Sequence, residues 1–502
     1  MRTLKDKRPN ILFIMSDDHA SHAMSCYGSR INETPNLDRI AQGGMRFDNC
    51  FCTNSICTPS RAVILAGTYN HVNGVTTLAT KMDNTLLTFP KLLQRAGYQT
   101  AIFGKWHLGT GPAHCPTGFD AWRVLPGQGL YHHPEMIDPE GTKVVNGYAT
   151  DIITDLSLDW LKDRDTTKPF CLLCHHKAPH RWWEPDEKHA KMYDDIEIPC
   201  PETFDDDYSN RARAAAEAKM RIERDFNYRD LKLVPPEGAD KMTRLDVPDS
   251  IEGYSLTTQE GETITFGSQA ELKRFKYQRY IKEYLRCVAS VDDNVGRMLD
   301  WLDAEGLADN TIVIYTSDQG FFLGDHGWYD KRFMYEESLR MPFVIRYPRE
   351  IKPESVNEDI MLNVDFPATF LDYAGVDLPD TFQGSSFRPL LNGRTPDDWQ
   401  TSMYYRYWMH LAHHHVCAHY GVRTLRHKLI YYYGQALDQE GAIEEPMEPE
   451  WELFDLDKDP CELNNVYHNP AYADVVSNLK AELSRLQKQV GDEPYEPSQF
   501  RS

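Results

Sequence analysis

The chain has 502 residues, of which 41% are hydrophobic and 26% are charged. This length exceeds what one hydrophobic core usually supports, so it predicts a large domain plus a smaller one. The 54 basic and 76 acidic residues give a net charge of −22, which argues against nucleic acid and anionic membranes as partners because the field of the protein would repel them. An anionic substrate would therefore need a locally basic pocket.

The N-terminal sequence predicts a cytoplasmic protein. Residues 1–10 lack the apolar core of a signal peptide, and the apolar run that follows, residues 11–15, is too short to span a bilayer. The 11 cysteines are an odd number scattered along the chain, which favours reduced thiols over a disulfide framework. Cys171 and Cys174 have zinc-like spacing, but strand alternation would send them to opposite faces with no second pair nearby.

The first four hundred residues alternate between predicted strands and helices. Apolar runs predict strands at residues 10–15, 98–103, 168–174 and 311–316. Helices are expected at residues 89–96 and 281–302, and a glycine ends each of them. The alternation predicts an α/β fold with a covered, largely parallel sheet.

Two later stretches change this pattern. Residues 201–269 are first acidic, then basic, then rich in Pro and Gly, so we expect an insertion over the surface. Short aromatic strands are expected at residues 403–408, 421–424, 428–433 and 452–455, with a last helix at 471–490. We therefore divide the chain into a large domain, residues 1–395, and a smaller α+β domain, residues 396–502, with an antiparallel sheet and one helix.

Two predicted strands end in acidic residues. Asp17 and Asp18 follow the first strand, and Asp318 and Gln319 follow the strand at 311–316. In open α/β sheets ligands bind at the carboxyl ends of strands, and three carboxylates that converge there would repel one another unless a cation lay among them. Oxygen ligands favour calcium or magnesium over zinc or copper. A single Asp-Asp pair after a strand is as often a turn or a helix cap, but this sequence has two acidic strand ends.

The sharpest local pattern is Cys57-Thr58-Pro59-Ser60-Arg61, followed by an apolar run and Gly67. Thr58 suits an N-cap and Pro59 suits the first helical position, which puts Cys57 at the N-terminus of a helix. The free N–H groups there attract an anion, and Arg61 adds a bidentate donor for a tetrahedral oxyanion. The alternative interpretation is a buried cysteine that precedes a capped helix.

In these residues the chain resembles the type I sulfatases of the alkaline phosphatase superfamily. Residues 57–67 match their signature of Cys, any residue, Pro, Ser or Ala, and Arg, with an aliphatic and Gly tail. The resemblance spans most of residues 8–490, and it implies an alkaline-phosphatase-like fold in which helices flank a large, mostly parallel sheet. It also implies that a formylglycine-generating maturation enzyme oxidises Cys57 to formylglycine (3-oxoalanine), whose hydrated form, a geminal diol, attacks the sulfur of a sulfate ester.

The resemblance gives roles to residues that by themselves suggest surface charges or capping groups. The implied catalytic residues are Cys57, Arg61, Lys105, His107, His180 and Lys331. The implied metal ligands, around calcium or alternatively magnesium, are Asp17, Asp18, Cys57, Asp318 and Gln319. Gln319 departs from the Asn that is common in the family, but it offers the same amide oxygen one methylene further out, so we expect the site to persist.

Residues 324–338 and 451–460 resemble those of bacterial carbohydrate sulfatases in particular. We therefore expect a hydrolase that releases inorganic sulfate from a sulfated carbohydrate. Candidate substrate-binding residues are Gln128, His413, His414 and His415. The aromatic residues at 403–408 are expected to cover a sugar ring beside the histidines, and the alternative for this stretch is the core of the small domain.

Two other functions stay open. A phosphonate monoester hydrolase or phosphodiesterase would use the same nucleophile, since fold and nucleophile underdetermine the substrate. A catalytically inactive glycan-binding protein is the alternative of another class, although every implied catalytic position is filled. The sequence indicates neither the sugar nor the position of its sulfate, and it leaves the oligomeric state open.

Overall fold

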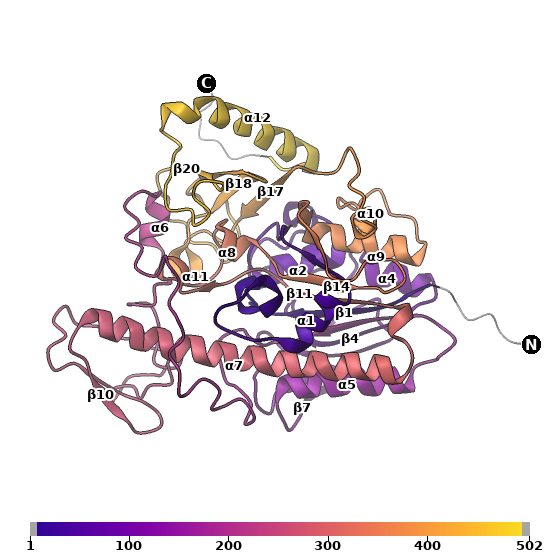
Figure 1. The fold of residues 1–502 in the computed structure, drawn as a ribbon, viewed down its shortest axis with the longest axis horizontal. Coiled ribbons are helices and arrows are strands. Elements are labelled where there is room, and N and C mark those ends of the chain that lie inside the picture. The colour runs from indigo at the N-terminus through magenta and orange to yellow at the C-terminus, as the bar shows by residue number, and fades with distance from the viewer. Residues whose placement is uncertain (1–7, 494–502) are drawn as a thin grey trace, which may run out of the picture.

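The computed structural model describes residues 8–493, and its largest element is a ten-stranded sheet (Figure 1). The strand order is β15-β2-β14-β11-β1-β8-β4-β5-β6-β7. In that order the strands are Ser355–Asn357, Met45–Phe47, Phe343–Arg346, Thr311–Ser317, Asn10–Ser16, Phe170–His175, Gln99–Lys105, Ala121–Leu125, Glu135–Asp138 and Gly141–Val144. The outermost parts of the two predicted domains, residues 1–7 and 494–502, lie outside the described residues.

The centre of the sheet is parallel. The five strands from β11 to β5 run in one direction, and antiparallel pairs occur toward both edges. Every residue of β1, β8 and β11 is buried, which explains why these strands are continuous apolar runs in the sequence rather than alternating ones. The predicted α/β fold with a mostly parallel sheet is confirmed.

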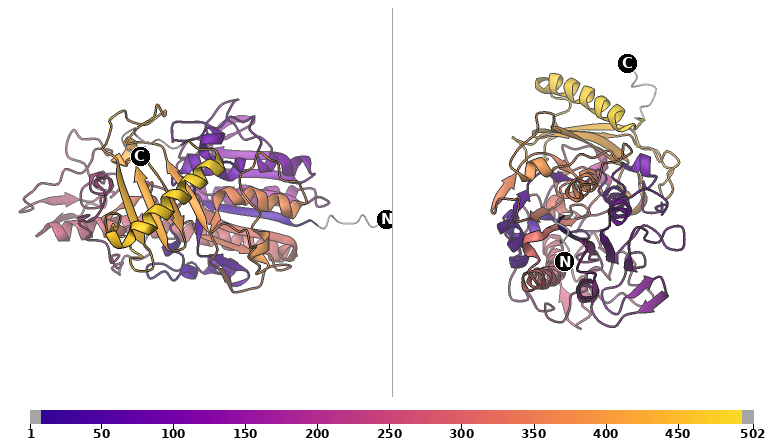
Figure 2. Two further views of the ribbon diagram at one scale, coloured as in Figure 1. Left: turned by 90° about the horizontal axis from the view of Figure 1, so that it is seen from above. Right: turned by 90° about the vertical axis from the view of Figure 1, so that its right-hand side faces the viewer.

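Helices cover both faces of this sheet (Figures 1 and 2). On one face lie α1 (Pro35–Gln42), α5 (Ala149–Asp163) and α7 (Gln269–Ala304). On the other face lie α2 (Cys57–Ala66), α4 (Phe89–Arg95) and α9 (Phe366–Ala374). Shorter elements join these parts: α3 (Asn70–Asn73), α6 (Arg213–Glu217), α8 (Glu336–Leu339), α10 (Arg388–Leu391), α11 (Ala412–His415), β3 (Cys50–Phe51), β12 (Phe322–Leu323), β13 (Tyr329–Asp330) and β16 (Met361–Leu362).

Two helix starts differ from the prediction. Helix α7 has 36 residues and begins at Gln269 instead of residue 281, with the side chain of Ser268 accepting the N–H of Glu271 as an N-cap. Helix α2 begins at Cys57, so the predicted N-cap at Thr58 is wrong. The Thr58 hydroxyl instead donates to the backbone carbonyl of His107 at 3.0 Å, a tertiary contact that local helix rules do not anticipate.

The segment of residues 201–269 is largely irregular, with one short helix and a two-stranded sheet of β9 (Ser255–Thr257) and β10 (Thr263–Thr265). The prediction of an insertion over the surface is wrong for its middle, because Met220, Ile222, Phe226 and Leu233 are buried. The Phe226 ring packs on that of Tyr280, 5.3 Å away between centroids, in the first turns of α7. These apolar residues follow neither helical nor strand spacing, so the sequence pattern did not reveal that they are core residues.

The C-terminal part is a four-stranded antiparallel sheet with a helix across it, as predicted. The strands are β17 (Ser402–Tyr407), β18 (His419–Thr424), β19 (His427–Tyr432) and β20 (Glu450–Asp455). Helix α12 (Ala473–Val490) crosses this sheet diagonally (Figure 2). The domain boundary at residue 395 stays a prediction.

In the part of the chain that the structure describes, no helix is both long and apolar enough to cross a membrane. The cellular compartment stays a prediction from the sequence.

Candidate active site

Two acidic strand ends meet at one edge of the main sheet. Strands β1 and β11 are neighbours in parallel register, with Ser16 paired to Ser317, so the chain leaves both strands at the same edge. The backbone N–H of Asp18 donates to Asp318 Oδ1 at 3.3 Å. The Gln319 amide donates to Asp18 Oδ1 at 2.5 Å. The structure therefore gathers four fully buried side chains that the sequence nominates as metal ligands: Asp17, Asp18, Asp318 and Gln319.

The first turn of α2 is tied to this acidic cluster. The Ser60 hydroxyl donates to the backbone carbonyl of Asp318 at 2.5 Å, and Arg61 Nε donates to Asp318 Oδ2 at 2.9 Å. Arg61 also donates through Nη1 to the backbone carbonyl of Lys105 at 3.0 Å. These contacts fix the position of Cys57, which is the first residue of α2 and is 1% exposed.

Cys57 is not set up to react as a thiolate. Burial raises the pKa of its thiol to about 11; the charge of Lys331 lowers it, and the charges of Asp318 and Asp18 raise it further. The thiol is therefore protonated at neutral pH, and a protonated thiol is a poor nucleophile. Cys57 therefore lies among charged side chains, but its thiol is a poor nucleophile there.

Two buried lysines pair with the carboxylates. Lys105 Nζ forms an ion pair with Asp17 and also donates to the side-chain oxygen of Gln128. Burial lowers the pKa of Lys105 well below its usual value. Lys331 Nζ donates to Asp18 Oδ1 at 2.5 Å. Burial opposes its charge too, but the nearby carboxylates of Asp18 and Asp330 raise the pKa of Lys331 above its usual value.

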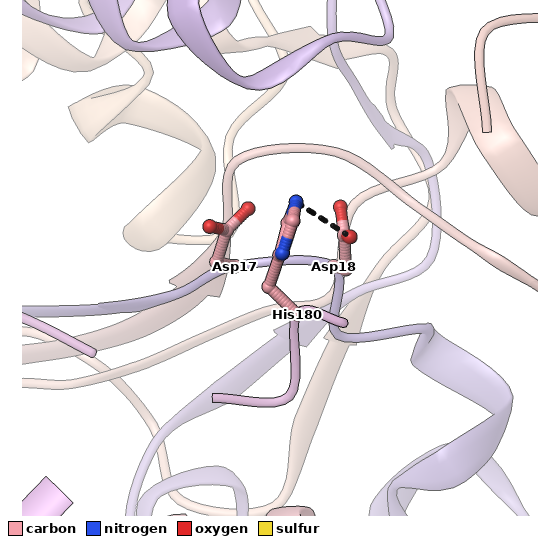
Figure 3. A group of neighbouring side chains, drawn as sticks. All are labelled: Asp17, Asp18 and His180. Carbon is pink, nitrogen blue, oxygen red and sulfur yellow. Dashed lines mark ion pairs between the residues drawn. The ribbon is translucent and has the colours of Figure 1, made fainter. Parts of the chain in front are cut away.

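Two histidines complete the set of predicted catalytic residues. The His180 ring lies between the carboxylates of Asp17 and Asp18 (Figure 3), with Nε2 3.7 Å from Asp18 Oδ2. His180 Nδ1 lies 2.5 Å from the backbone carbonyl of Arg181. His107 Nδ1 lies 3.2 Å from the Thr58 hydroxyl, in the first turn of α2. Burial lowers the pKa of both imidazoles well below the usual value, so both rings are neutral at pH 7.

The buried oxygen atoms of this cluster fit a bound cation. Asp17 Oδ1, Asp18 Oδ2 and Gln319 Oε1 are buried without a hydrogen-bond partner. Asp17, Asp18 and His180 each offer an atom within 4.8 Å of the others. Burial raises the pKa of Asp18 to about 7, the response of a carboxylate removed from water without sufficient counter-charge. Asp318 is already held by Arg61 and by the N–H of Asp18, so it would share its oxygen atoms with any cation bound there.

The candidate substrate-binding residues do not all lie together. Gln128 contacts Lys105 Nζ directly. His414 Nε2 lies 3.2 Å from Asp330 Oδ2 and 3.3 Å from Arg181 Nη1. Asp330 is the residue before Lys331 in the chain. His413 is exposed, and the charges of Arg332 and Asp330 act on it. His415 has a different charged environment, formed by Lys219, Glu217 and Glu445.

The aromatic strand β17 is core rather than a cover for a sugar ring. Tyr404, Tyr405 and Tyr407 are fully buried, so the predicted stacking role is wrong for them. The Tyr405 hydroxyl donates to the backbone carbonyl of Arg332 at 2.6 Å and accepts the N–H of Ser55 at 3.2 Å. β17 therefore joins the C-terminal sheet to the two segments that carry Cys57 and Lys331.

Several residues support the site that sequence reasoning did not identify. The Tyr284 hydroxyl, from α7, donates to the backbone carbonyl of Asp18 at 2.7 Å, where Asp18 has a left-handed backbone with φ of 67°. The Tyr131 hydroxyl donates to the backbone carbonyl of His180 at 2.7 Å. Asp330 pairs with His414 and with Arg332. Of these residues, only Asp330 could have been recognised from the sequence, because it stands beside Lys331 in the charged tripeptide Asp330-Lys331-Arg332.

Comparisons with known proteins identify the family of the chain. Residues 9–376 match the family model described as sulfatase, and residues 324–489 match the one described as N-sulphoglucosamine sulphohydrolase, C-terminal. The chain is 45% identical over 503 residues to the N-acetylglucosamine-6-O-sulfatase of Bacteroides thetaiotaomicron. That alignment covers 97% of this chain and 87% of the relative.

Solved structures show the same fold. One, described as a complex with its substrate D-glucosamine-2-N,6-O-disulfate, is 43% identical with a TM-score of 0.86, and the match covers 96% of this chain and 98% of that one. The phosphonate monoester hydrolase of Silicibacter pomeroyi has a TM-score of 0.69 at 21% identity, over 97% of this chain and 96% of that one, a likeness of fold alone. The family match and the 45% identity over nearly the whole chain show that the protein belongs to the type I sulfatase family and is a sulfatase.

Proposed function

We propose that this sulfatase removes the 6-O-sulfate of a sulfated glucosamine, with formylglycine at position 57 and a divalent cation, calcium or magnesium, beside it. The observation that carries the proposal is the placement of Cys57 at the N-terminus of α2, among the charges of Lys331, Asp318, Asp18 and Arg61. The sugar is suggested by two of the matches above, a relative named N-acetylglucosamine-6-O-sulfatase and a structure solved with a glucosamine disulfate.

The residues present would hold the implied groups as follows. Asp17, Asp18, Asp318 and Gln319 would bind the cation together with residue 57, and the cation would supply positive charge against the sulfate oxygens. Formylglycine would supply a hydrated aldehyde as the nucleophile, in place of a thiol whose high pKa makes it unreactive.

The protein's own cations would hold the sulfate. Arg61, Lys105 and Lys331 converge on the cluster from three different segments, each fixed by contacts to protein oxygen atoms. A preorganised donor of this kind contributes on the order of 10² to 10³ in rate, because it need not reorient as charge develops. The N-terminus of α2 adds its free N–H groups to the same place.

Lys331 is the better candidate to protonate the departing sugar oxygen. His180 Nδ1 faces the Arg181 carbonyl and must carry the hydrogen of the neutral ring, so its Nε2 is an acceptor. Lys331 Nζ carries hydrogens in its charged state and already donates to Asp18. His107 Nδ1 contacts the Thr58 hydroxyl, so Nε2 is the nitrogen that is free to accept a proton from residue 57.

A substrate panel tests this function. Protein co-expressed with a formylglycine-generating enzyme would be assayed for anion release from N-acetylglucosamine-6-O-sulfate, glucosamine-2-N,6-O-disulfate, a 3-O-sulfated glucosamine, an aryl sulfate and a phosphonate monoester. The proposal expects the highest kcat/KM on a 6-O-sulfated sugar. Faster turnover of the phosphonate, or of the 3-O-sulfated sugar, would overturn it.

His414 is expected to matter for the sugar more than for the sulfate. Replacing His414 by alanine removes the contacts to Asp330 and Arg181, and we expect kcat/KM on the 6-O-sulfated sugar to fall by roughly 10- to 100-fold, the effect of losing a hydrogen bond to a charged group. An aryl sulfate, which needs only the sulfate pocket, should lose about twofold, as for a remote substitution. His427→Ala, at the first residue of β19 beside Asp455, is the control. Equal losses on both substrates would assign His414 a structural role.

A further inference from the structure

Residues 219–230, which we call the brace, contact three segments of the candidate site. The N–H of Lys219 donates to the carbonyl of His414 at 2.6 Å, and His414 Nδ1 lies 3.0 Å from the carbonyl of Lys219. The N–H of Tyr329, which stands two residues before Lys331, donates to the carbonyl of Met220 at 3.0 Å. The third contact is an ion pair between Asp230 and Arg181, the residue after His180.

This ion pair is bidentate, and its carboxylate is fully buried while the Arg181 side chain is 17% exposed. Arg181 Nε lies 3.1 Å from Asp230 Oδ1, and Nη2 lies 2.6 Å from Oδ1 and 2.5 Å from Oδ2. The Asp230 carboxylate is fully buried and also accepts the N–H of Asn227 at 2.9 Å. The N–H of Asp230 in turn donates to Asn227 Oδ1 at 2.8 Å. Asp230 therefore presents both oxygen atoms to Arg181 from a turn that two hydrogen bonds with Asn227 close.

Arg181 contacts two histidines of the site, one through its backbone and one through its side chain. Its backbone carbonyl meets His180 Nδ1 at 2.5 Å, which sets the direction of the His180 ring. Its Nη1 meets His414 Nε2 at 3.3 Å, on the side of the site where the sugar is proposed to bind. Its guanidinium also lies over the Tyr329 ring, 5.2 Å from the centroid. Arg181 thus connects the segments of residues 180, 329 and 414, the first through its backbone carbonyl and the other two through its side chain.

We infer that Asp230 is a positioning residue for sugar selectivity, and that the brace holds the Arg181 side chain against His414. The inference rests on the proposed function for the identity of the sugar. Without the Asp230 charge, the Arg181 guanidinium would lose the carboxylate that it contacts through Nε and Nη2, so it would move and release His414. His180 contacts the backbone carbonyl of Arg181, which also accepts from Lys177 Nζ at 3.3 Å, and the rest of the sulfate pocket is built on α2, β1 and β11. The sulfate pocket therefore does not depend on the contact of Asp230 with the Arg181 side chain.

Asp230→Asn tests the inference, because it removes the charge and keeps the shape. We expect kcat/KM on N-acetylglucosamine-6-O-sulfate to fall by about 10²-fold, the usual cost of displacing a positioning group by an ångström, and kcat/KM on an aryl sulfate by about twofold. Asp455→Asn is the matched control, since Asp455 is also buried and bidentate to an arginine, Arg426, in the C-terminal sheet. That control should leave the ratio of the two activities unchanged.

A second variant separates positioning from folding. If Asp230 acts only through Arg181, then Asp230→Asn should cause no further loss once Arg181 has been replaced. The double variant Arg181→Met/Asp230→Asn should therefore be no less active on the sugar than Arg181→Met alone. Additive losses would show that Asp230 does not act through Arg181 and would overturn the inference. Equal losses on sugar and aryl sulfate in Asp230→Asn would overturn it as well.

Hydrogen–deuterium exchange tests the brace independently of the substrate. In Asp230→Asn, exchange should rise in peptides that cover residues 178–183 and 412–416, while Asp455→Asn should leave both unchanged. Unchanged exchange in Asp230→Asn would overturn the brace whatever the enzyme hydrolyses. If exchange rises but the unaltered enzyme is inactive on every 6-O-sulfated sugar, the brace is supported and only the proposed substrate fails.

Discussion

Cys57→Ala is expected to lower kcat for sulfate release by on the order of 10⁶, the typical effect of removing the residue that forms the covalent intermediate. The side chain is buried and small, and no other described contact depends on it, so the variant should fold with nearly the same melting temperature. Sulfate release would be followed on N-acetylglucosamine-6-O-sulfate and on an aryl sulfate. Both should be lost together, because residue 57 serves the reaction and not the choice of sugar.

Cys115→Ala is the matched control for this variant. Cys115 is only partly buried and lies outside the acidic cluster, so its replacement should change kcat by about twofold or less. A Cys57→Ala protein that still releases sulfate at a comparable rate would show that another group attacks sulfur. The contacts of Ser60 and Arg61 would then have to be explained as a purely structural anchor of α2.

Asp318→Ala is expected to abolish turnover, by at least about 10³-fold, because it removes one proposed cation ligand and the partner of Arg61 at once. Asp318→Asn keeps the shape of the side chain and guards against a folding defect. Both variants should contain less calcium or magnesium than the unaltered protein by elemental analysis. If either variant turns over normally, or if metal-free protein is fully active, the cation has no role in the reaction.

Thermal unfolding gives a second measure of the same site. A ligand that binds only the folded protein stabilises it by about 2.7 kcal/mol at a concentration of 100 Kd. Calcium or magnesium should therefore raise the melting temperature of the unaltered protein, and EDTA should reverse the shift. In Asp318→Asn the shift should be smaller, since a neutral amide replaces one of the three carboxylates proposed to bind the cation. An identical shift in both proteins would place the cation elsewhere.

The parts of the fold that follow local rules could be predicted from the sequence. Strands β1, β8 and β11 are continuous apolar runs because both faces of the sheet are covered. The start of α7 and the burial of the apolar residues between 220 and 233 could not be predicted, because they depend on each other through contacts such as that of Phe226 with Tyr280. The aromatic strand β17 was ambiguous for a related reason, since aromatic residues occur both in cores and around sugars.

In the candidate site, too, residues that follow local rules could be predicted, and residues that act through distant contacts could not. Asp17, Asp18, Asp318 and Gln319 could be nominated because residues after parallel strands share one edge of the sheet. Tyr284 and Asp230 could not, because they act on site residues far away in the sequence, Asp18 and Arg181. In the sequence, Tyr284 resembles any residue on the apolar face of a helix, and Asp230 resembles any acidic residue in a turn.

The most direct measurement of the central proposal is the relation between the chemical state of residue 57 and activity. Protein would be prepared with graded co-expression of a formylglycine-generating enzyme, and peptide mass spectrometry would give the fraction of residue 57 present as formylglycine. We predict that kcat for sulfate release rises in proportion to that fraction and extrapolates to zero when every chain carries cysteine. Full activity in protein that carries only unmodified Cys57 would contradict the account.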